Sequence, residues 1–183
     1  MAKNTIAAPN VLKPFDEDNP SSIQVVIETP KGSRNKYKFD PKLRSFTLSR
    51  VLPDGMIFPY DFGFVPSTMA EDGDPIDVLL LMDSPAFPGC VIESRLIGVI
   101  QGEQNEGGQN KRNDRLIAVA NHNHTHSDLK NISGMNQKLL KEVAEFFVNY
   151  HRQDEVKYKF LGTKGPQEAA RLLDRAIRRE KAA

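Results

Sequence analysis

Cysteine is nearly absent from this sequence of 183 residues, which contains a single one at position 90. One cysteine cannot form an internal disulfide, so a disulfide-stabilised secreted scaffold is excluded and a reducing compartment is indicated. Cys90 stands in the stretch PGCVIE, beside apolar residues. We interpret it as a buried, inert small hydrophobe rather than a reactive thiol.

The sequence also lacks a long apolar run and an excess of charge. No stretch approaches the roughly 20 apolar residues that a membrane-spanning helix requires, and residues 1–20 contain no apolar segment long enough for a signal peptide. The 25 lysines and arginines are balanced by 24 aspartates and glutamates. This balance gives no indication of a nucleic-acid or membrane partner. We therefore expect a cytoplasmic protein that binds neither.

Short segments rich in β-branched and aromatic residues fill much of the chain, separated by turn-forming residues. The length suits one domain, and we predict a single domain over residues 1–183, in which residues 1–20 form a surface arm. The predicted strands are 23–29, 35–39, 45–51, 75–82, 91–101 and 115–120. Residues 102–114 are polar and contain glycine, and are predicted to be a loop.

The last third of the chain changes to a helical period. Residues 136–150 carry their apolar side chains on one face. Residues 166–182 have a proline in the first turn and basic residues at the end, as helices often do. A short strand is predicted between them at 157–162. Short strands followed by two helices predict an α+β domain, in which a small β-barrel packs against two C-terminal helices.

An acidic turn precedes one of the predicted strands. In EDGDPIDVLLL, residues 71–81, Asp72, Asp74 and Asp77 surround a glycine and a proline. Glycine allows a tight bend and proline stiffens it. Carboxylates this close together are costly to desolvate unless a cation neutralises them. Oxygen ligands on a rigid turn suit a hard cation such as Mg²⁺, with Mn²⁺ as a substitute.

Two other interpretations of this turn compete with a magnesium site. A calcium-binding EF-hand needs a ligand at the fifth loop position and flanking helices. Here the fifth position is Ile76 and a strand follows, so the EF-hand is excluded. A solvated turn without a ligand is usual for an arbitrary D-x-D pattern. It is much less usual for D-G-D-P-x-D running directly into an apolar strand.

The pattern D-G-D-P-x-D resembles the signature of the soluble family I inorganic pyrophosphatases. The stretches VVIETPKGSRNKYKFD, SRVLPDGMIFPYDFGFVPST, NDRLIAVA and EFFVNYH also occur in the family's order with similar spacing, over most of residues 23–165. The sequence is therefore identified as a member of this family. The resemblance implies a five-stranded OB-type barrel, Mg²⁺-dependent hydrolysis of pyrophosphate to two phosphates, and a homo-oligomer.

The resemblance also implies roles for particular residues. Asp72 and Asp77 match the ligands of the metal ions that activate the attacking water, and Asp74 matches the general base. Glu28 matches a carboxylate that faces the cavity, and we expect it to contribute to metal binding. The positions that match phosphate-binding residues are Lys36, Arg50, Tyr150 and Arg115, the last at a family lysine.

Several positions depart from the family pattern. Lys38 stands where the family has a glutamate. Because Lys38 and Lys36 are two residues apart on a strand, both side chains point to the same face, and we expect Lys38 to bind substrate phosphate. Phe58 and Phe62 replace tyrosines and lack their hydroxyls, and His151 replaces a lysine.

The family's second acidic motif, D-E-x-G-E-x-D-x-K, survives here only as NEGGQNKRNDR. Counting back from the strand LIAV places Asn113 at the last aspartate of the motif, with Asp114 one residue along. A β-bulge would bring Asp114 into the site, and we predict Asp114 as a metal ligand. Glu106 is the nearest candidate for the first aspartate. These changes predict a divergent member with altered metal number or substrate preference.

Other functions stay open from the sequence alone. An enzyme with this site could hydrolyse tripolyphosphate or a nucleotide, and a relative could bind phosphate without turnover. An OB-type barrel could also bind nucleic acid, although the acidic turn opposes a polyanion.

Finally, His122, His124 and His126 stand at alternate positions, where an extended chain would offer them to a transition metal. We interpret this segment as an exposed polar loop, because no fourth ligand is evident.

Overall fold

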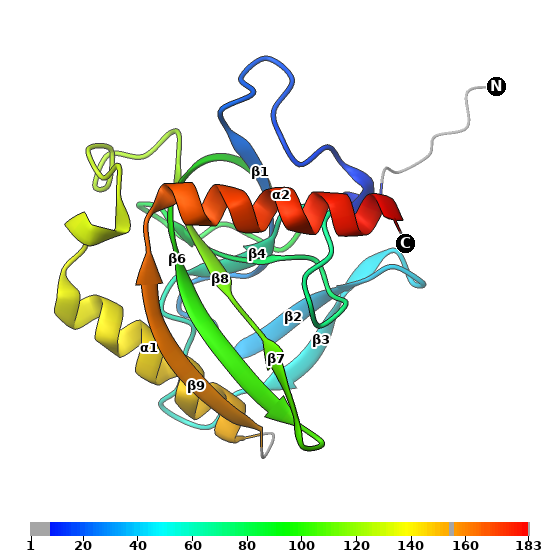
Figure 1. The fold of residues 1–183 in the computed structure, drawn as a ribbon, viewed down its shortest axis with the longest axis vertical. Coiled ribbons are helices and arrows are strands. Elements are labelled where there is room, and N and C mark those ends of the chain that lie inside the picture. Colours follow the sequence, from blue (N-terminus) through cyan, green and yellow to red (C-terminus); the bar gives the residue numbers. More distant parts are fainter. Residues whose placement is uncertain (1–7, 154–155, 183) are drawn as a thin grey trace.

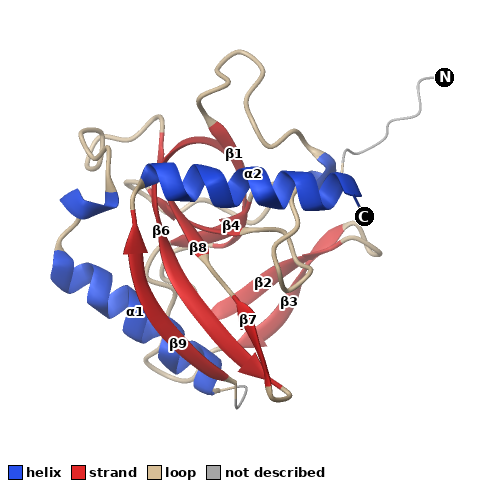
Figure 2. Ribbon diagram, in the orientation of Figure 1, coloured by secondary structure: helices blue, strands red, loops and turns tan. Residues whose placement is uncertain are grey.

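Five strands close into a ring in the computed structural model, which describes residues 8–153 and 156–182. Their order is β1–β4–β5–β8–β6, and β6 pairs back with β1. All neighbours are antiparallel except β5 and β8. The ring consists of β1 (Ile23–Thr29), β4 (Asp61–Phe64), β5 (Asp77–Leu81), β6 (Val91–Glu106) and β8 (Arg115–Ala120). The predicted five-stranded barrel is confirmed, and Figure 2 shows its strands curving around one another.

Two helices cover the barrel, α1 (Gln137–Arg152) and α2 (Pro166–Ala182). In Figure 1, α2 runs across the strands near the top of the view, and α1 lies beside β9 (Lys157–Lys164). The side chain of Asn136 caps α1 by accepting a hydrogen bond from the Lys138 N–H. Both helices lie within two residues of their predicted bounds, and the α+β class is confirmed.

Strand β5 is buried on both faces, as its uninterrupted apolar sequence predicts. Val78 belongs to the same buried cluster as Leu173 of α2. Leu79, on the opposite face, belongs to the cluster that contains Phe147 of α1. Because packing fixes both faces of β5, it also fixes Asp77, the first residue of the strand.

A second, two-stranded sheet lies beside β1. It is the antiparallel hairpin of β2 (Asn35–Asp40) and β3 (Ser45–Val51), in which Lys36 pairs with Arg50. The hairpin appears in cyan in Figure 1, and Lys36 of β2 contacts Tyr150 near the end of α1. Both strands were predicted, and the hairpin brings two predicted phosphate-binding residues next to each other.

The segment predicted as a loop, residues 102–114, is mostly a β-hairpin. Strand β6 continues to Glu106, and β7 (Gln109–Arg112) returns beside it. The turn uses Gly107 and Gly108 at φ values of 59° and 83°, a region that favours glycine. The loop prediction is wrong because these strand residues are polar, so no apolar alternation marks them.

Strand β4 is an element that the sequence analysis does not indicate, since it has only four residues, DFGF. Its close pairing with β1 depends on Gly63. A Cβ at this position would lie 2.0 Å from the carbonyl oxygen of Val26 on β1. The glycine therefore lets the two backbones approach and places Phe62 beside the cavity described below.

The N-terminal segment is attached to the barrel from residue 8 onward, and residues 1–7 lie outside the described residues. It forms a 3₁₀ turn at Pro9–Val11. The Ser67 N–H donates to the Asn10 carbonyl over 2.9 Å, and Phe15 forms an isolated bridge with Ile23.

A second 3₁₀ turn, Ile132–Gly134, precedes α1. Neither helix of the described residues is long and apolar enough to cross a membrane.

Cys90 lies just before β6 and packs against the core, but it is only partly buried, less than predicted. Burial raises the pKa of its thiol, and the negative charge of Asp61 raises it further. A thiol with a raised pKa stays protonated, which agrees with an unreactive cysteine.

Candidate active site

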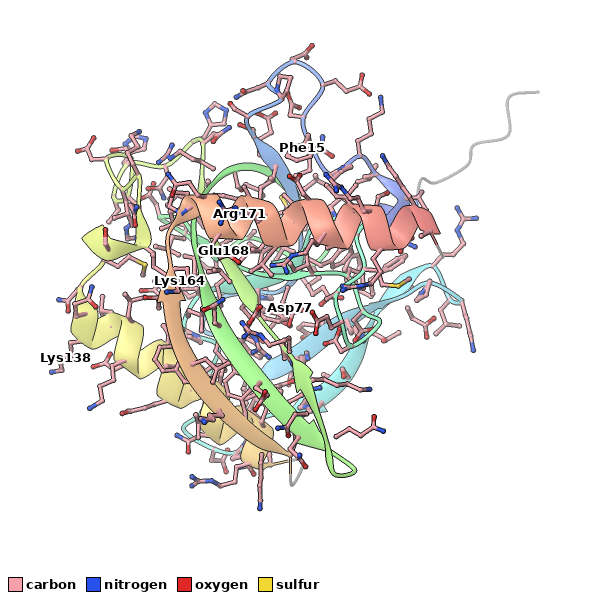
Figure 3. The ribbon with its side chains drawn as sticks, viewed as in Figure 1. Phe15, Asp77, Lys138, Lys164, Glu168 and Arg171 are labelled. Carbon is pink, nitrogen blue, oxygen red and sulfur yellow. The ribbon has the colours of Figure 1, made fainter. Side chains whose placement is uncertain are left out.

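One cavity of about 740 Å³ is bounded by the β2–β3 hairpin, the acidic turn and the C-terminal end of α1. Its walls include every predicted site residue except Asp114. These are Glu28, Lys36, Lys38, Arg50, Asp72, Asp74, Asp77, Arg115 and Tyr150. In Figure 3, Asp77 lies in the middle of the molecule, where nitrogen and oxygen atoms of neighbouring side chains gather. The fold therefore brings together residues that lie far apart in the sequence.

The acidic turn is held by its own hydrogen bonds. The Ala70 N–H donates to the Asp74 carbonyl over 2.7 Å, and the Asp74 N–H donates to the Asp72 carboxylate over 3.2 Å. Gly73 has φ +94°, a conformation that the residue between these two aspartates must adopt and that favours glycine. The turn thus presents its carboxylates to the cavity on a rigid backbone.

Burial makes three of the carboxylates that line the cavity hard to ionise. Desolvation raises the pKa of Asp77 to about 6, with Asp72 and Asp74 adding to the rise and Arg115 opposing it. Desolvation also raises the pKa of Glu28 to about 7, against a hydrogen bond from the Phe39 N–H. The pKa of Asp72 is raised by burial as well. These groups ionise more readily when a cation is bound beside them.

The carboxylates fit a magnesium ion that completes its coordination with other ligands. Within residues 8–153 and 156–182, no three histidine, cysteine, aspartate or glutamate side chains converge as a ready-made metal cage. Magnesium usually binds through one or two carboxylates together with water and substrate phosphate. Asp72 and Asp77, whose charges repel each other, supply such a pair.

Positive groups form the facing wall of the cavity. Lys36 Nζ donates to the Tyr150 hydroxyl over 2.7 Å, and the Arg50 guanidinium lies 4.8 Å from the centroid of the Tyr150 ring. Lys38 Nζ lies 2.8 Å from Asp74 Oδ2. Lys36 and Lys38 share one face of β2, as their spacing predicts. This wall offers donors at the places where a small phosphate anion would lie against the carboxylates.

Arg115 occupies the floor of the cavity and is almost fully buried, with 2% of its surface exposed. Its guanidinium lies 4.0 Å from the centroid of the Phe147 ring. Its Nε is 3.7 Å from Asp77 Oδ2 and makes no hydrogen bond with the described residues. A buried donor without a partner is rare in folded proteins and marks this group as available to a ligand.

Asp114 does not face the cavity, so its predicted place in the metal site is corrected. Its Oδ1 accepts hydrogen bonds from the Gly102 N–H and from Arg112. Asn113 lines the cavity instead, because neighbouring residues of an extended chain point to opposite sides. The strand pairing shows no bulge between Arg112 and Arg115 that would turn Asp114 inward.

Sequence reasoning missed Gln104, whose side chain lines the cavity and accepts a hydrogen bond from Asn113 Nδ2. Extending the predicted strand beyond residue 101 with alternating faces would have found it. Asn10 and Glu180 also line the cavity, at positions without a sequence signal. The side chain of Glu106, predicted as an alternative ligand, lies outside the described part of the structure.

The histidine segment is not extended. Residues 121–130 form bends and turns, and the backbone N–H groups of His124 and Thr125 donate to the Asp83 carboxylate. In the described part of the chain, the three histidines join no cluster of metal-ligating side chains. This agrees with the interpretation of an exposed polar loop.

Carboxylates that face lysines and arginines across one cavity suit an enzyme that acts on small phosphate anions with the help of a metal ion. Comparisons with known proteins agree with this class. Residues 25–181 match the family described as inorganic pyrophosphatase. The inorganic pyrophosphatase of Nostoc sp. is 38% identical over 162 residues, covering 88% of this chain and 94% of that protein. The one from Thermus thermophilus is 35% identical over 161 residues, covering 88% and 90%.

Solved structures give the same result. The crystal structure of inorganic pyrophosphatase from Thermus thermophilus matches with a TM-score of 0.86 and 32% identity, covering 96% of this chain and 99% of that one. The inorganic pyrophosphatase from Neisseria gonorrhoeae matches with a TM-score of 0.84 and 30% identity over the same shares. The chain belongs to the inorganic pyrophosphatase family, as its motifs predict.

Proposed function

We propose that the protein hydrolyses inorganic pyrophosphate to two phosphates in a reaction that depends on Mg²⁺, with Mn²⁺ able to substitute. The observation that carries this proposal is the cavity itself, in which Asp72, Asp74 and Asp77 face Lys36, Arg50 and Arg115. Its volume of about 740 Å³ accommodates a small, highly charged anion together with metal ions and water. The family membership of the chain supports the same substrate.

The carboxylates divide between metal binding and proton transfer. Asp72 and Asp77, with Glu28, would hold the metal. Bound Mg²⁺ lowers the pKa of water and neutralises phosphate oxygens. Asp74 is less buried than Asp77, and its Oδ2 is bonded to Lys38 Nζ over 2.8 Å. Once Lys38 turns to a phosphate oxygen, the Asp74 carboxylate can reach a water molecule at the mouth of the turn. We assign it the role of general base, which accepts a proton as the water oxygen attacks phosphorus and the bridging P–O bond breaks.

The facing wall binds the phosphates. Lys36, Arg50 and Tyr150 would contact one phosphate from the hairpin side, since they already form one connected group. Arg115 would contact the other from the floor of the cavity. Lys38 would bind a phosphate oxygen after leaving Asp74. Charge-assisted hydrogen bonds of this kind are strong and keep substrate and water in line.

Two alternative functions make different predictions. A hydrolase of tripolyphosphate or of a nucleotide would use the same groups, and a phosphate-binding relative would bind phosphate without turnover.

We also infer a homo-oligomer from the resemblance. Several large apolar side chains are exposed, among them Leu43, Phe87 and Val11, each about two-thirds accessible. Analytical ultracentrifugation measures the assembly directly.

Phosphate release is the experiment that tests the proposal. We expect rapid release from pyrophosphate with Mg²⁺, slower release with Mn²⁺, and none with excess EDTA. Tripolyphosphate and nucleoside triphosphate at equal concentration should give far less phosphate. Faster release from either of them would replace the proposed substrate. Phosphate binding without any turnover would identify a non-catalytic relative.

A further inference from the structure

Two protein groups hold the guanidinium of Arg115 in one orientation. Its Nη1 donates to the Asn113 carbonyl over 3.2 Å, and its Nη2 lies 2.9 Å from Nε2 of His151. The guanidinium is also placed between two rings, 4.0 Å from the centroid of Phe147 and 5.1 Å from that of Tyr158. A planar group bound at its edge and on its faces has little freedom to rotate.

His151 must be neutral to make this contact. A guanidinium has five N–H donors and no acceptor, so Nε2 of His151 accepts the hydrogen bond and the ring carries its proton on Nδ1. Burial, together with the charges of Arg115, Lys36 and Arg50, lowers the pKa of His151 to about 3. His151 is therefore an acceptor throughout the neutral range of pH.

The ring of His151 is itself fixed by packing. It stacks on Tyr158 of β9, with ring centroids 4.7 Å apart and an angle of 12° between the planes. Tyr158 reaches this position because residue 102 is a glycine, since a Cβ there would lie 1.9 Å from the tyrosine hydroxyl oxygen. The position of Arg115 thus depends on a series of contacts that extends from Gly102 on β6, through Tyr158, to His151 in the last turn of α1.

We propose that His151 is a positioning residue, which holds Arg115 so that its guanidinium is presented to a phosphate in the cavity, with Nε beside Asp77 and not hydrogen-bonded to it. This inference rests on the proposed function for the identity of the phosphate, and on the contacts above for the positioning. A cation at position 151 would repel the guanidinium instead of orienting it. Arg115 and His151 therefore act as a matched pair of one cation and one neutral acceptor.

Substitutions that keep or reverse the acceptor test this pairing. His151→Gln keeps an acceptor oxygen, whereas His151→Lys introduces a second cation. Arg115→Lys combined with His151→Lys gives the two lysines of the family pattern, whose flexible stems let the ammonium groups turn apart, so that neither depends on an acceptor at the other position. The matched control is His122→Lys, the same change on the exposed loop. Melting temperatures identify any variant that does not fold, in which case the glutamine variant and the double variant carry the test.

The first readout is independent of turnover. The Nε–H of a rigid, buried arginine exchanges slowly with water and gives a sharp NMR resonance, and we expect this resonance for Arg115 in the wild type and in His151→Gln. It should broaden or disappear in His151→Lys. A mobile Arg115 side chain in the wild type, or a rigid one in His151→Lys, would overturn the proposal whether or not the protein hydrolyses pyrophosphate.

The second readout is kinetic. We expect His151→Gln to retain kcat/KM within about threefold, and His151→Lys to lose about tenfold to a hundredfold, the range of coupling between groups in contact. The double variant should recover at least about tenfold relative to His151→Lys. Equal losses in His151→Gln and His151→Lys would show that His151 only fills space. Absence of turnover in a wild type whose Arg115 is rigid would reject the proposed function but not the positioning.

Discussion

Lys38 Nζ and Asp74 Oδ2 lie 2.8 Å apart, so the proposed general base forms an ion pair with a lysine from the opposite wall of the cavity. Burial lowers the pKa of Lys38, but the hydrogen bond and the charge of Asp74 outweigh burial and raise the pKa overall. The lysine therefore stays charged at neutral pH. It places a positive charge where a metal ion or a phosphate would otherwise approach the acidic turn.

Lys38→Glu should increase the affinity for Mg²⁺ and weaken the binding of metal-free pyrophosphate, because it removes a competing cation and adds an oxygen ligand. We expect the half-saturating Mg²⁺ concentration to fall about tenfold, which corresponds to about 1.4 kcal/mol. Phe62→Tyr, which adds a hydroxyl to the cavity wall, should strengthen this effect in the double variant. Turnover measured against Mg²⁺ concentration gives the shift.

The control for Lys38→Glu is Lys159→Glu, which makes the same change in charge at an exposed position on β9. It should leave the Mg²⁺ curve unchanged. Superimposable curves for wild type, Lys38→Glu, Phe62→Tyr and the double variant would show that neither residue tunes the site.

Asp77→Asn and Asp74→Asn should each reduce turnover by at least about a hundredfold, the usual scale for the loss of a metal ligand or a general base. The fold should survive, because the amide is nearly isosteric. Since burial raises the pKa of Asp77 to about 6, removing its charge should maintain or raise the melting temperature in EDTA. Asp128→Asn, on the exposed loop before α1, is the control. Wild-type rates in folded Asp77→Asn protein would remove the acidic turn from the mechanism.

Asp114→Asn and Asn113→Asp should have opposite consequences. Asp114 bonds Arg112 and the Gly102 N–H away from the cavity, so Asp114→Asn should leave turnover within about threefold of wild type. Because the carboxylate is largely buried, the loss of its charge should cost roughly 1–3 kcal/mol of stability. Asn113→Asp adds a carboxylate to the cavity and should increase the affinity for Mg²⁺. Calorimetric titration with Mg²⁺ and thermal unfolding measure both effects. A large loss of turnover in Asp114→Asn would contradict this placement.

His151→Gln should make the fold less sensitive to acid. The folded protein holds the pKa of His151 at about 3, below the ordinary histidine value of 6.5, so between these values the unfolded chain binds more protons. Stability from His151 is therefore present above pH 6.5 and is lost as the pH falls toward 3. The melting temperature of His151→Gln relative to wild type should rise as the pH falls from 7 to 4.5. Buried carboxylates act in the opposite direction in both proteins, so they cancel in the difference. A constant difference would contradict a neutral, buried His151.

The sequence predicts those elements whose burial leaves a pattern. Apolar alternation, or a helical period between turn residues, reports directly which face is covered. The bounds are correct at both ends for β1, β8 and α2, which carry buried faces. They are also correct for β3, a strand without a buried residue, which is marked by its β-favouring residues and flanking turns. The acidic turn could be predicted equally well. Its aspartates lie within a few residues of one another, so the local backbone alone brings their side chains together.

Features set by distant contacts leave no such pattern. Strand β7 is polar, and β4 exists because Gly63 lets its backbone approach β1. To tell whether Asn113 or Asp114 faces the cavity, one must know which side of the sheet each side chain points to. A shift of one residue in the register moves every side chain of the strand to the opposite side. The contact between Arg115 and His151 joins residues from β8 and α1 that no local pattern connects.

Strand β6 is hydrogen-bonded to β1, β7, β8 and β9, and three of these partners follow it in the chain. During synthesis, the first half of the protein therefore leaves the ribosome with an open sheet. The acidic turn is made early, yet its cavity is completed only when Arg115 and then Tyr150 and His151, in the last third of the chain, have been made. We expect closure of the ring to be slow, because it joins distant segments. Until then, the apolar strands β1 and β5 are exposed to aggregation and to chaperones.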